Sequence, residues 1–309
     1  MKNEILDVII IGGGPAGFTS GIYTSREKLN TLLLEKSMCG GLPAITDLIE
    51  NYPGFPEGIS GMELVSRFRR QAEKFGVNIR EYEGVQSIIP GDGVIRVRTE
   101  NGEYITRTVI IATGGLPRKI NVPGETEYIG KGVSYCATCD GPFYRDAEIA
   151  VIGGGDAAIQ EAIFLTKFAR KVTVIHRRDK LRASPILQQR AFANEKIDFL
   201  WDSVPVEIAG EELVKSITVK NVKTGQFDAL NVEGVFIFIG WNPNTGFVRD
   251  LLKLDEAGHI ITDTYLRTNI EGIFAVGDVR SKKFRQIAEA CGDATVGALA
   301  ASEYISDLN

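Results

Sequence analysis

Residues 7–17 read DVIIIGGGPAG, an apolar and β-branched run that ends in a glycine-rich turn. The run predicts a buried strand, and the pattern FTSGIYTSREK at residues 18–28 predicts an amphipathic helix. Between them, Gly12, Gly14 and Gly17 have the spacing G-x-G-x-x-G. Glycines at this spacing let the backbone approach a pyrophosphate, whose charge then lies at the helix N-terminus. The stretch therefore predicts the strand, turn and helix of a dinucleotide-binding unit.

The next predicted strand, NTLLLE at residues 30–35, ends in an acidic residue. Glu35 follows the glycine turn by about 20 residues, where a carboxylate accepts hydrogen bonds from ribose hydroxyls. An acid at this place disfavours a 2′-phosphate. The first unit is therefore predicted to bind a dinucleotide with a free adenosine ribose, such as FAD or NAD.

The same pattern recurs in the middle of the chain. A strand at residues 147–152, AEIAVI, precedes the turn GGGDAA at residues 153–158 and a second helical pattern. Ala158 takes the place of the third glycine, which helix packing on the strand allows. After the strand KVTVI at residues 171–175, however, the chain continues with HRRDKLRAS instead of an acid.

Basic residues therefore stand at the ribose end of this second unit: His176, Arg177, Arg178 and Arg182. Guanidinium groups match phosphate oxygens bidentately, so the arginines predict contact with the 2′-phosphate of NADPH. A solvated basic turn is the alternative. His176 is interpreted equally well as a structural histidine or as a phosphate contact.

A third region supports a flavin. Residues 268–279, TNIEGIFAVGDV, predict a strand that ends in Gly277 and Asp278, and a long helix is predicted to begin near Gln286 and Ile287. Asp278 could accept hydrogen bonds from a ribityl chain, and the helix N-terminus could stabilise a reduced, anionic flavin ring. A strand-capping aspartate is the alternative. Two sites with opposite charge at the ribose end predict two cofactors, FAD and NADPH.

The stretch CATCDG at residues 136–141 holds two cysteines separated by two residues. A closed metal site needs about four N or S ligands, yet the chain has only two histidines and no second C-x-x-C, so no metal is expected. A structural disulfide closing so short a loop would constrain the unfolded chain little. Cys136 and Cys139 are therefore predicted to cycle between dithiol and disulfide.

Composition excludes several classes of protein. A length of 309 residues suggests about two domains, and 44% hydrophobic with 24% charged residues is typical of globular proteins. The net charge of −5 argues against a nucleic-acid partner. The short apolar N-terminal run lacks a leader pattern or membrane-spanning length, so a cytoplasmic protein without a membrane segment is expected. Cys39 and Cys291 are expected to stay thiols without a chemical role.

The order of the motifs resembles a known family along essentially the whole chain. GGGPAG, ENYPGF, IIATGG, CATCDG, GGGDAA, HRRDKLRA, GIFAVGD and RQI follow one another as in low-molecular-weight, bacterial-type thioredoxin reductases, pyridine nucleotide-disulfide oxidoreductases of class II. The motif order predicts an α/β fold with two Rossmann-like, three-layer domains, the NADPH domain inserted into the FAD domain. We expect the FAD domain at residues 1–117 and 247–309 and the NADPH domain, with the C-x-x-C, at residues 118–246.

The resemblance also implies roles for individual residues. For FAD it implies Gly12, Gly14, Pro15, Ala16, Gly17, Glu35, Lys36, Gly40, Gly41, Leu42, Asn51, Thr113, Gly114, Gly277, Asp278, Arg285, Gln286 and Ile287. For NADPH it implies Gly153, Gly155, Asp156, Ala157, His176, Arg177, Arg178 and Arg182. Cys139 would be the sulfur beside the flavin, Cys136 the sulfur that exchanges with thioredoxin, and Asp140 the proton donor and acceptor.

The implied reaction passes electrons from NADPH to FAD, then to the cysteine pair and finally to thioredoxin, in a homodimer. Because the cysteines and the NADPH site share one domain while both need the same flavin, a domain rotation between half-reactions is expected. Two residues depart from the family pattern: Leu42 replaces the usual Gln, and Pro142 a common aromatic. The alternatives are another acceptor (a glutaredoxin-like protein, a peroxidase component or oxygen), a ferredoxin-type donor, and a flavin-binding redox sensor.

Overall fold

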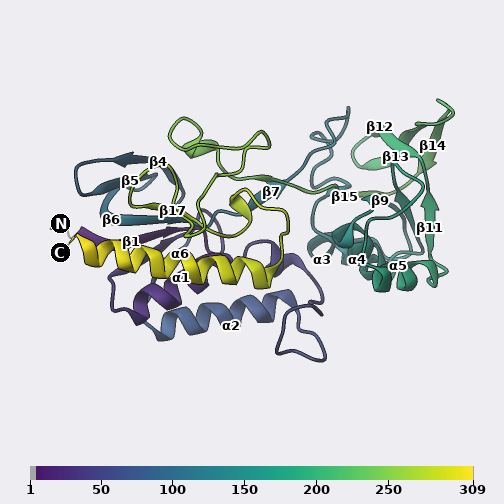
Figure 1. The fold of residues 1–309 in the computed structure, drawn as a ribbon. Coiled ribbons are helices and arrows are strands. Elements are labelled where there is room, and N and C mark those ends of the chain that lie inside the picture. The colour runs from purple at the N-terminus through teal and green to yellow at the C-terminus, as the bar shows by residue number, and fades with distance from the viewer. Residues whose placement is uncertain (1–4, 309) are drawn as a thin grey trace. The chain divides into compact units, whose positions relative to one another are not determined.

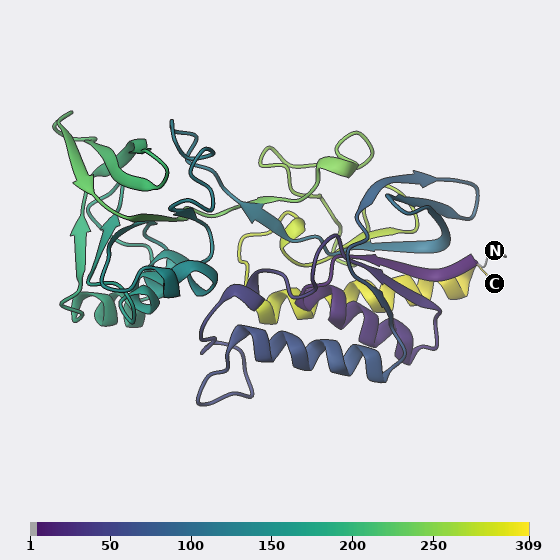
Figure 2. The same cartoon turned by 180° about the vertical axis from the view of Figure 1, so that it is seen from behind.

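The computed structural model describes residues 5–308, which form two compact units (Figures 1 and 2). Unit 1 contains the chain up to Ala44, Leu48–Leu116, and the chain from Asn242 onward. Unit 2 contains Pro117–Trp241 together with the short segment Ile45–Asp47. The chain thus leaves unit 1 and returns to it. The crossings are two short strands, β7 (Gly115–Pro117) and β16 (Trp241–Pro243), which pair with each other.

Unit 1 is built on a seven-stranded sheet with the order β3-β2-β1-β6-β5-β4, in which β17 also pairs with β6. The pairs of β1 with β2 and β6, of β2 with β3 and of β6 with β17 are parallel, and β4 and β5 are antiparallel additions. The strands are β1 Ile5–Ile11, β2 Thr31–Leu34, β3 Asn78–Arg80, β4 Val85–Pro90, β5 Ile95–Thr99, β6 Glu103–Ile111 and β17 Ile273–Ala275.

Three helices cover one face of this sheet: α1 (Pro15–Arg26), α2 (Gly61–Lys74) and α6 (Ile287–Asp307) (Figures 1 and 2). Side chains of β1 alternate between the two faces, as the period of a strand requires. Val8 and Ile10 pack with Phe18 of α1 and the alanines of α6, whereas Ile9 and Ile11 belong to a separate cluster on the other face. Complete burial of such a side chain contributes about 1.5–3 kcal/mol, which explains why the apolar run forms the central strand.

Unit 2 has a five-stranded parallel sheet with the order β11-β10-β9-β15-β8. Its strands are β8 Val133–Ser134, β9 Glu148–Gly153, β10 Lys171–Ile175, β11 Ile197–Leu200 and β15 Gly234–Phe238. Helices α4 (Asp156–Leu165) and α5 (Pro185–Phe192) pack on one face, and the short α3 (Ala137–Asp140) precedes β9 in the chain.

The other face of unit 2 is covered by an antiparallel sheet of β12 (Ser203–Gly210), β13 (Val214–Asn221) and β14 (Phe227–Asn231) (Figure 1). Unit 2 therefore has three layers, and the α/β class with parallel sheets is confirmed. None of the helices within residues 5–308 combines the length and apolar character that a bilayer crossing requires.

Candidate active site

At Gly12 and Gly17 the turn between β1 and α1 tolerates no side chain. Gly12 has a φ of +112°, and a Cβ on Gly17 would meet the carbonyl oxygen of Gly12. Gly14, in an extended conformation, is the N-cap of α1 and supplies no side-chain cap, and Pro15 is the first helical residue. Because Pro15 has no N–H and no side chain caps the following turn, the remaining N–H groups at this helix end are available to an anion.

Glu35 is held against this turn at the end of β2. Its Oε2 accepts a hydrogen bond from the Gly13 N–H at 2.8 Å, and its Oε1 accepts from the N–H of Ser37 at 3.0 Å. Lys36 is exposed beside it. The predicted acid therefore lies next to the predicted pyrophosphate turn, which is the arrangement needed to contact the pyrophosphate and the adenosine ribose of one dinucleotide.

The segment around Gly40 and Gly41 also returns to the turn. The Gly40 N–H donates to the Gly13 carbonyl at 2.8 Å, and a Cβ on Gly41 would lie 3.3 Å from Gly14 Cα. Leu42 begins the short helix Leu42–Ile45 directly afterwards. The structure thus brings residues 40–42 to the glycine turn.

The segment after β6 is held by the chain that returns from unit 2. Thr113 Oγ1 donates to the Asn244 carbonyl at 2.8 Å, and Gly114 takes a left-handed conformation with a φ of +57°. Thr113 and Gly114 follow β6, which is the direct neighbour of β1 in the sheet. They therefore lie at the same edge of the sheet as the glycine turn.

The C-terminal segment meets the same turn. A Cβ on Gly277, whose φ is +72°, would lie 2.9 Å from the Cβ of Ala16. Asp278 follows within the short helix η4 (Gly277–Val279). Asp278, although far from Gly12 and Ala16 in the chain, thereby lies at the same end of the sheet.

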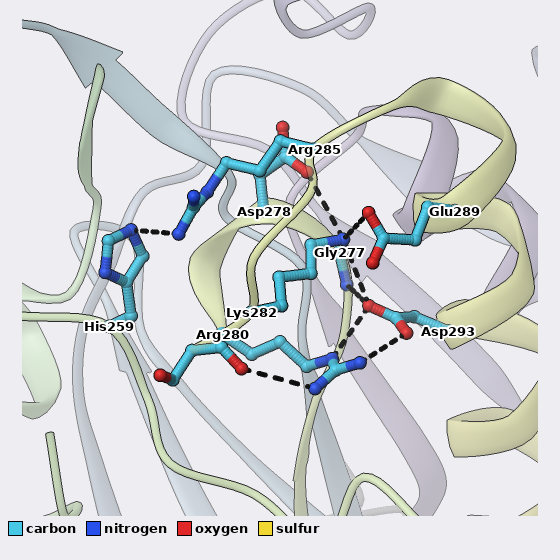
Figure 3. Close-up of polar contacts among 9 residues, drawn as sticks. His259, Gly277, Asp278, Arg280, Lys282, Arg285, Glu289 and Asp293 are labelled. Atoms are coloured by element: carbon cyan, nitrogen blue, oxygen red, sulfur yellow. Dashed lines mark hydrogen bonds and ion pairs between the residues drawn. The ribbon is translucent and has the colours of Figure 1, made fainter. Parts of the chain in front are cut away.

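Around Asp278 lies a dense group of charged side chains (Figure 3). Lys282 Nζ is 3.4 Å from Asp278 Oδ1. It is also close to two carboxylates of α6, at 3.5 Å from Glu289 Oε2 and 3.2 Å from Asp293 Oδ2. Arg280 donates two hydrogen bonds to Asp293, each at 2.8 Å. Burial alone would raise the pKa of Asp293, but the Arg280 and Lys282 cations hold it below its ordinary value.

Helix α6 begins at Ile287, as predicted, and its N-cap Gln286 makes no side-chain cap. Gln286 Oε1 instead accepts a hydrogen bond from Asn51 Nδ2 at 3.1 Å, so two predicted residues 235 positions apart are in contact. Arg285 donates to His259 Nε2 at 2.7 Å (Figure 3). The predicted positions 51 and 285–287 thus surround the N-terminus of this helix.

These residues fit a flavin dinucleotide on three counts. No side chain caps the N-terminus of α1, and the glycine turn has no Cβ atoms that would keep a ligand away from its backbone. The buried Oδ1 of Asp278 accepts no hydrogen bond within residues 5–308. A buried oxygen that accepts no hydrogen bond costs free energy, which a ribityl hydroxyl would relieve by donating to it.

In unit 2 the second glycine turn borders a cavity of about 190 Å³. Gly155 is the uncapped, extended N-cap of α4, and a Cβ there would meet nothing within 4 Å. Gly153 has a φ of +150° and packs on the fully buried Ala158. Four of the residues predicted to contact NADPH line the cavity: Gly155, Asp156, Ala157 and Arg182. Asp156 also accepts a hydrogen bond from the Ser184 N–H, which fastens the arginine loop to α4.

The guanidinium groups of Arg177, Arg178 and Arg182 are exposed, and within the described part of the chain none pairs with a carboxylate. The neighbouring acids Asp179 and Asp202 pair instead with Lys223. The three cations are therefore available to an anionic ligand.

His176 differs from its arginine neighbours because its side chain is buried. Its ring lies where a Cβ on Gly154 would be, and Nε2 is 3.1 Å from the Lys180 carbonyl. Burial lowers the pKa of His176, which favours the neutral ring. Its contacts in the structure are those of a residue that supports the glycine turn and the arginine loop from beneath.

Cys136 and Cys139 form a disulfide at the start of α3. Cys139 is exposed and Cys136 half-buried, and the Cys139 N–H lies 3.1 Å from Cys136 Sγ. An N–H directed at sulfur stabilises negative charge there, as a thiolate requires. Asp140 follows directly, and its charge contributes, after burial, to raising the pKa of Tyr144.

The other two cysteines lie in unit 1. Burial, with help from Glu81 and Glu35, raises the pKa of Cys39 to about 12, and burial also raises the pKa of Cys291. Both thiols therefore resist forming thiolates. Within residues 5–308 no three His, Cys, Asp or Glu side chains gather as metal ligands.

Sequence reasoning missed Arg280, Lys282, Glu289 and Asp293. The alternation of Asp278, Arg280 and Lys282 was a visible signal of charge pairing. Their partners, however, come from the first and second turns of α6, and the residues between them form a loop without periodicity.

Comparisons with known proteins agree along the whole chain. The family model described as pyridine nucleotide-disulphide oxidoreductase matches residues 6–294. The thioredoxin reductase of Bacillus subtilis is 46% identical, covering 99% of this chain and 97% of its own length. That of Peptoclostridium litorale is 44% identical over 100% of this chain and 99% of its own. The crystal structure of Lactococcus lactis thioredoxin reductase superimposes with a TM-score of 0.95 at 51% identity, covering 98% of this chain and 99% of the other.

Proposed function

The chain belongs to the pyridine nucleotide-disulphide oxidoreductase family and, within it, to the thioredoxin reductases, and on this premise we propose that it uses NADPH to reduce the disulfide of a thioredoxin. The observation that carries the proposal is the Cys136–Cys139 disulfide in the same unit as an unpaired arginine loop. A disulfide that only stabilises the fold would not need the arginine loop, and a protein that only binds a nucleotide would not need the disulfide.

FAD is proposed to bind in unit 1. The backbone N–H groups after Gly14 would hold its pyrophosphate, Glu35 its adenosine ribose and Asp278 its ribityl chain, with the N-terminus of α6 at the flavin ring. When bound, FAD supplies the two-electron carrier between the nicotinamide and the disulfide. The buried Oδ1 of Asp278 supports this assignment, because it accepts no hydrogen bond within the described residues, although the Lys282 ammonium lies 3.4 Å away.

NADPH is proposed to bind in unit 2, along the cavity beside Gly155. The N-terminus of α4 would meet the pyrophosphate, and Arg177, Arg178 and Arg182 the 2′-phosphate. Their exposure and lack of carboxylate partners support this assignment. His176 supports the loop without needing to contact the ligand.

The thiol chemistry balances with two electrons and two protons. Reduction opens the Cys136–Cys139 bond to two thiols, and the Cys136 thiolate attacks one sulfur of the partner disulfide. A mixed disulfide forms, and the leaving thiolate takes a proton for which Asp140 is the proposed donor. The Cys139 thiolate then attacks Cys136, restores the internal disulfide and releases the fully reduced partner.

Two further elements belong to this proposal. Because the disulfide and the NADPH site lie in unit 2 and the FAD site in unit 1, turnover is proposed to involve rotation about the connecting strands β7 and β16. A cross-link that immobilises the units should stop turnover while FAD stays bound, and full activity of the cross-linked protein would contradict the rotation. A homodimer in the cytoplasm is proposed from the family, and the mass in solution by light scattering tests the dimer.

The central test is anaerobic. NADPH is added to the purified protein in excess over the flavin and the Cys136–Cys139 disulfide together while the visible flavin absorbance is followed, and a larger excess of oxidised thioredoxin is then added. We expect prompt bleaching and then recovery with thioredoxin. A flavin that bleaches with dithionite but not with NADPH would overturn NADPH as the donor and favour a ferredoxin-type donor. Bleaching that only a glutaredoxin-like protein or oxygen reverses would overturn thioredoxin as the acceptor.

Cysteine variants test the order of thiol transfer. Cys139→Ser leaves Cys136 as the one thiol of the pair. It should attack a thioredoxin whose single active-site cysteine carries thionitrobenzoate as a mixed disulfide, release thionitrobenzoate and form a stable protein–protein disulfide, whereas Cys136→Ser should form none. Mass spectrometry of the trapped complex identifies the joined cysteines. Because Cys139 is the more exposed of the two, trapping through Cys139 is the specific outcome that would reverse the proposed roles.

A further inference from the structure

Lys282 is a buried cation among carboxylates. Its side chain is 4% exposed, and its ammonium nitrogen lies between Asp278, Glu289 and Asp293 at 3.2–3.5 Å (Figure 3). A lysine ammonium is costly to remove from water, so its position needs compensating charge. The carboxylates supply that charge, and in return Lys282 is a nearby cation for each of them.

One of the three carboxylates has a stronger partner already. Asp293 accepts two hydrogen bonds from Arg280 and a third, at 3.2 Å, from the Gly277 N–H. Asp278 and Glu289 have no comparable arginine fork: Asp278 Oδ1 and Glu289 Oε2 are buried and accept no hydrogen bond within the described residues. The charge of Lys282 therefore matters most for Asp278 and Glu289.

Opposing effects act on the ionisation of Asp278, and its pKa is raised overall. Burial raises its pKa, while the positive charges of Lys282 and Arg285 lower it and the negative charge of Glu289 raises it. Two more titratable groups lie one contact further from Asp278. Asp293 of α6 accepts a hydrogen bond from Lys282, and His259, in the loop that follows β16, accepts one from Arg285. Helix α1 approaches through Ala16 and has no acidic residue in its first turn.

We propose that Lys282 is a positioning residue for flavin binding, which keeps Asp278 ionised and oriented to accept hydrogen bonds from the ribityl chain of FAD. The inference rests on the proposed function, because it assigns a further residue to the FAD site. Lys282 acts through Asp278 and needs no contact with the cofactor.

The consequence is a pH dependence that appears when Lys282 is removed. Without its charge the pKa of Asp278 rises further, so the carboxyl group gains a proton at a higher pH. A hydrogen bond to a charged acceptor is roughly twice as strong as one to a neutral acceptor, so FAD affinity falls as Asp278 is protonated. Removing Glu289 should act in the opposite direction, because its negative charge favours protonation of Asp278.

The test is the dissociation constant of FAD as a function of pH. FAD is removed from the holoprotein, and rebinding is followed by the quenching of flavin fluorescence. For Lys282→Met we expect the dissociation constant to rise by about tenfold between about pH 8.5 and pH 6, against about twofold for the wild type, since one lost charged hydrogen bond has this magnitude.

The chain offers a matched control next to Lys282. Lys283 is exposed and lies over the ring of Phe284 at 5.3 Å, so Lys283→Met removes a lysine of the same loop without touching Asp278. It should follow the wild-type profile. Lys282→Arg should restore much of that profile, and Glu289→Gln should extend the flat part of the profile to lower pH.

The outcomes distinguish a failure of the Lys282 role from a failure of the proposed function. A Lys282→Met profile parallel to that of Lys283→Met would overturn the role of Lys282 and leave the proposed function standing. A wild-type protein that binds no FAD at any pH would overturn both. If Lys282→Met does not fold, the test rests on Glu289→Gln. A rise of its FAD dissociation constant at low pH identical to that of the wild type would overturn the coupling to Asp278.

Discussion

Replacement of Arg177 and Arg178 by alanine should change the choice between NADPH and NADH. Both guanidinium groups are exposed and pair with no carboxylate in the described chain, so a bound 2′-phosphate would gain their hydrogen bonds without breaking an existing ion pair. Solvent screening at this exposure limits each contact to about 1–1.5 kcal/mol. The pair of substitutions should therefore cost about 2–3 kcal/mol, or roughly 30- to 150-fold in kcat/KM for NADPH.

The assay is steady-state reduction of thioredoxin with each nucleotide in turn. The kcat/KM for NADH should stay within about threefold of the wild type, because NADH lacks the phosphate, and added salt should weaken NADPH alone. Arg170→Ala is the matched control, since Arg170 is an exposed arginine of unit 2 paired with Glu148 at 3.0 Å. Equal losses for the two nucleotides, or none for NADPH, would refute the assignment of the arginine loop.

Three further changes have defined outcomes. Gly17→Ala should yield protein with little FAD and a lower melting temperature, because the new Cβ would collide with the Gly12 carbonyl of the same turn. The control is Gly292→Ala, at an exposed position of α6 with open space around it, which should raise the free energy of unfolding by about 0.5–1 kcal/mol. Burial raises the pKa of Glu161 from its ordinary value of 4.5 to about 8, so folding retains a proton. Stability is then lost as pH rises between these values, and the gain in unfolding free energy from Glu161→Gln should grow by up to about 1.4 kcal/mol per pH unit, measured by urea unfolding. Phe143→Ser removes an 82% exposed ring near the disulfide and should raise the KM for thioredoxin about tenfold, while Phe227→Ser, 60% exposed on β14, should not; equal KM values would contradict a docking role.

The fold class could be predicted because local patterns and tertiary structure agree. The apolar run before Gly12 forms the central strand, the glycine turn leads into α1, and the same succession at Gly153 builds unit 2. In each case a stretch of about fifteen residues predicts both the type of secondary structure and which face of it is buried. The antiparallel layer β12–β14 was not predicted, since its strands mix polar and apolar residues and its register depends on the sheet beneath.

Side-chain roles were less accessible to the sequence. Whether His176 contacts a ligand or supports the loop depends on the Gly154 backbone, against which its ring lies, and on Trp201, whose ring lies edge-on to it at 6.4 Å. In the sequence, Lys282 looks like any other lysine of its loop. Only the folded position of α6 brings Glu289 and Asp293 beside it. Such contacts depend on tertiary packing that no local pattern records.

The interrupted course of the chain through unit 1 has a consequence for biosynthesis. Strand β17 pairs with β6, and Gly277 packs on Ala16, so the first sheet and the proposed flavin site require residues made after all of unit 2. On the ribosome, unit 2 is complete while unit 1 still lacks β17 and α6, and the exposed edge of β6 must wait for them. We therefore expect unit 2 to fold before unit 1 during translation, although unit 1 begins first, and the proposed FAD to bind only at the last step.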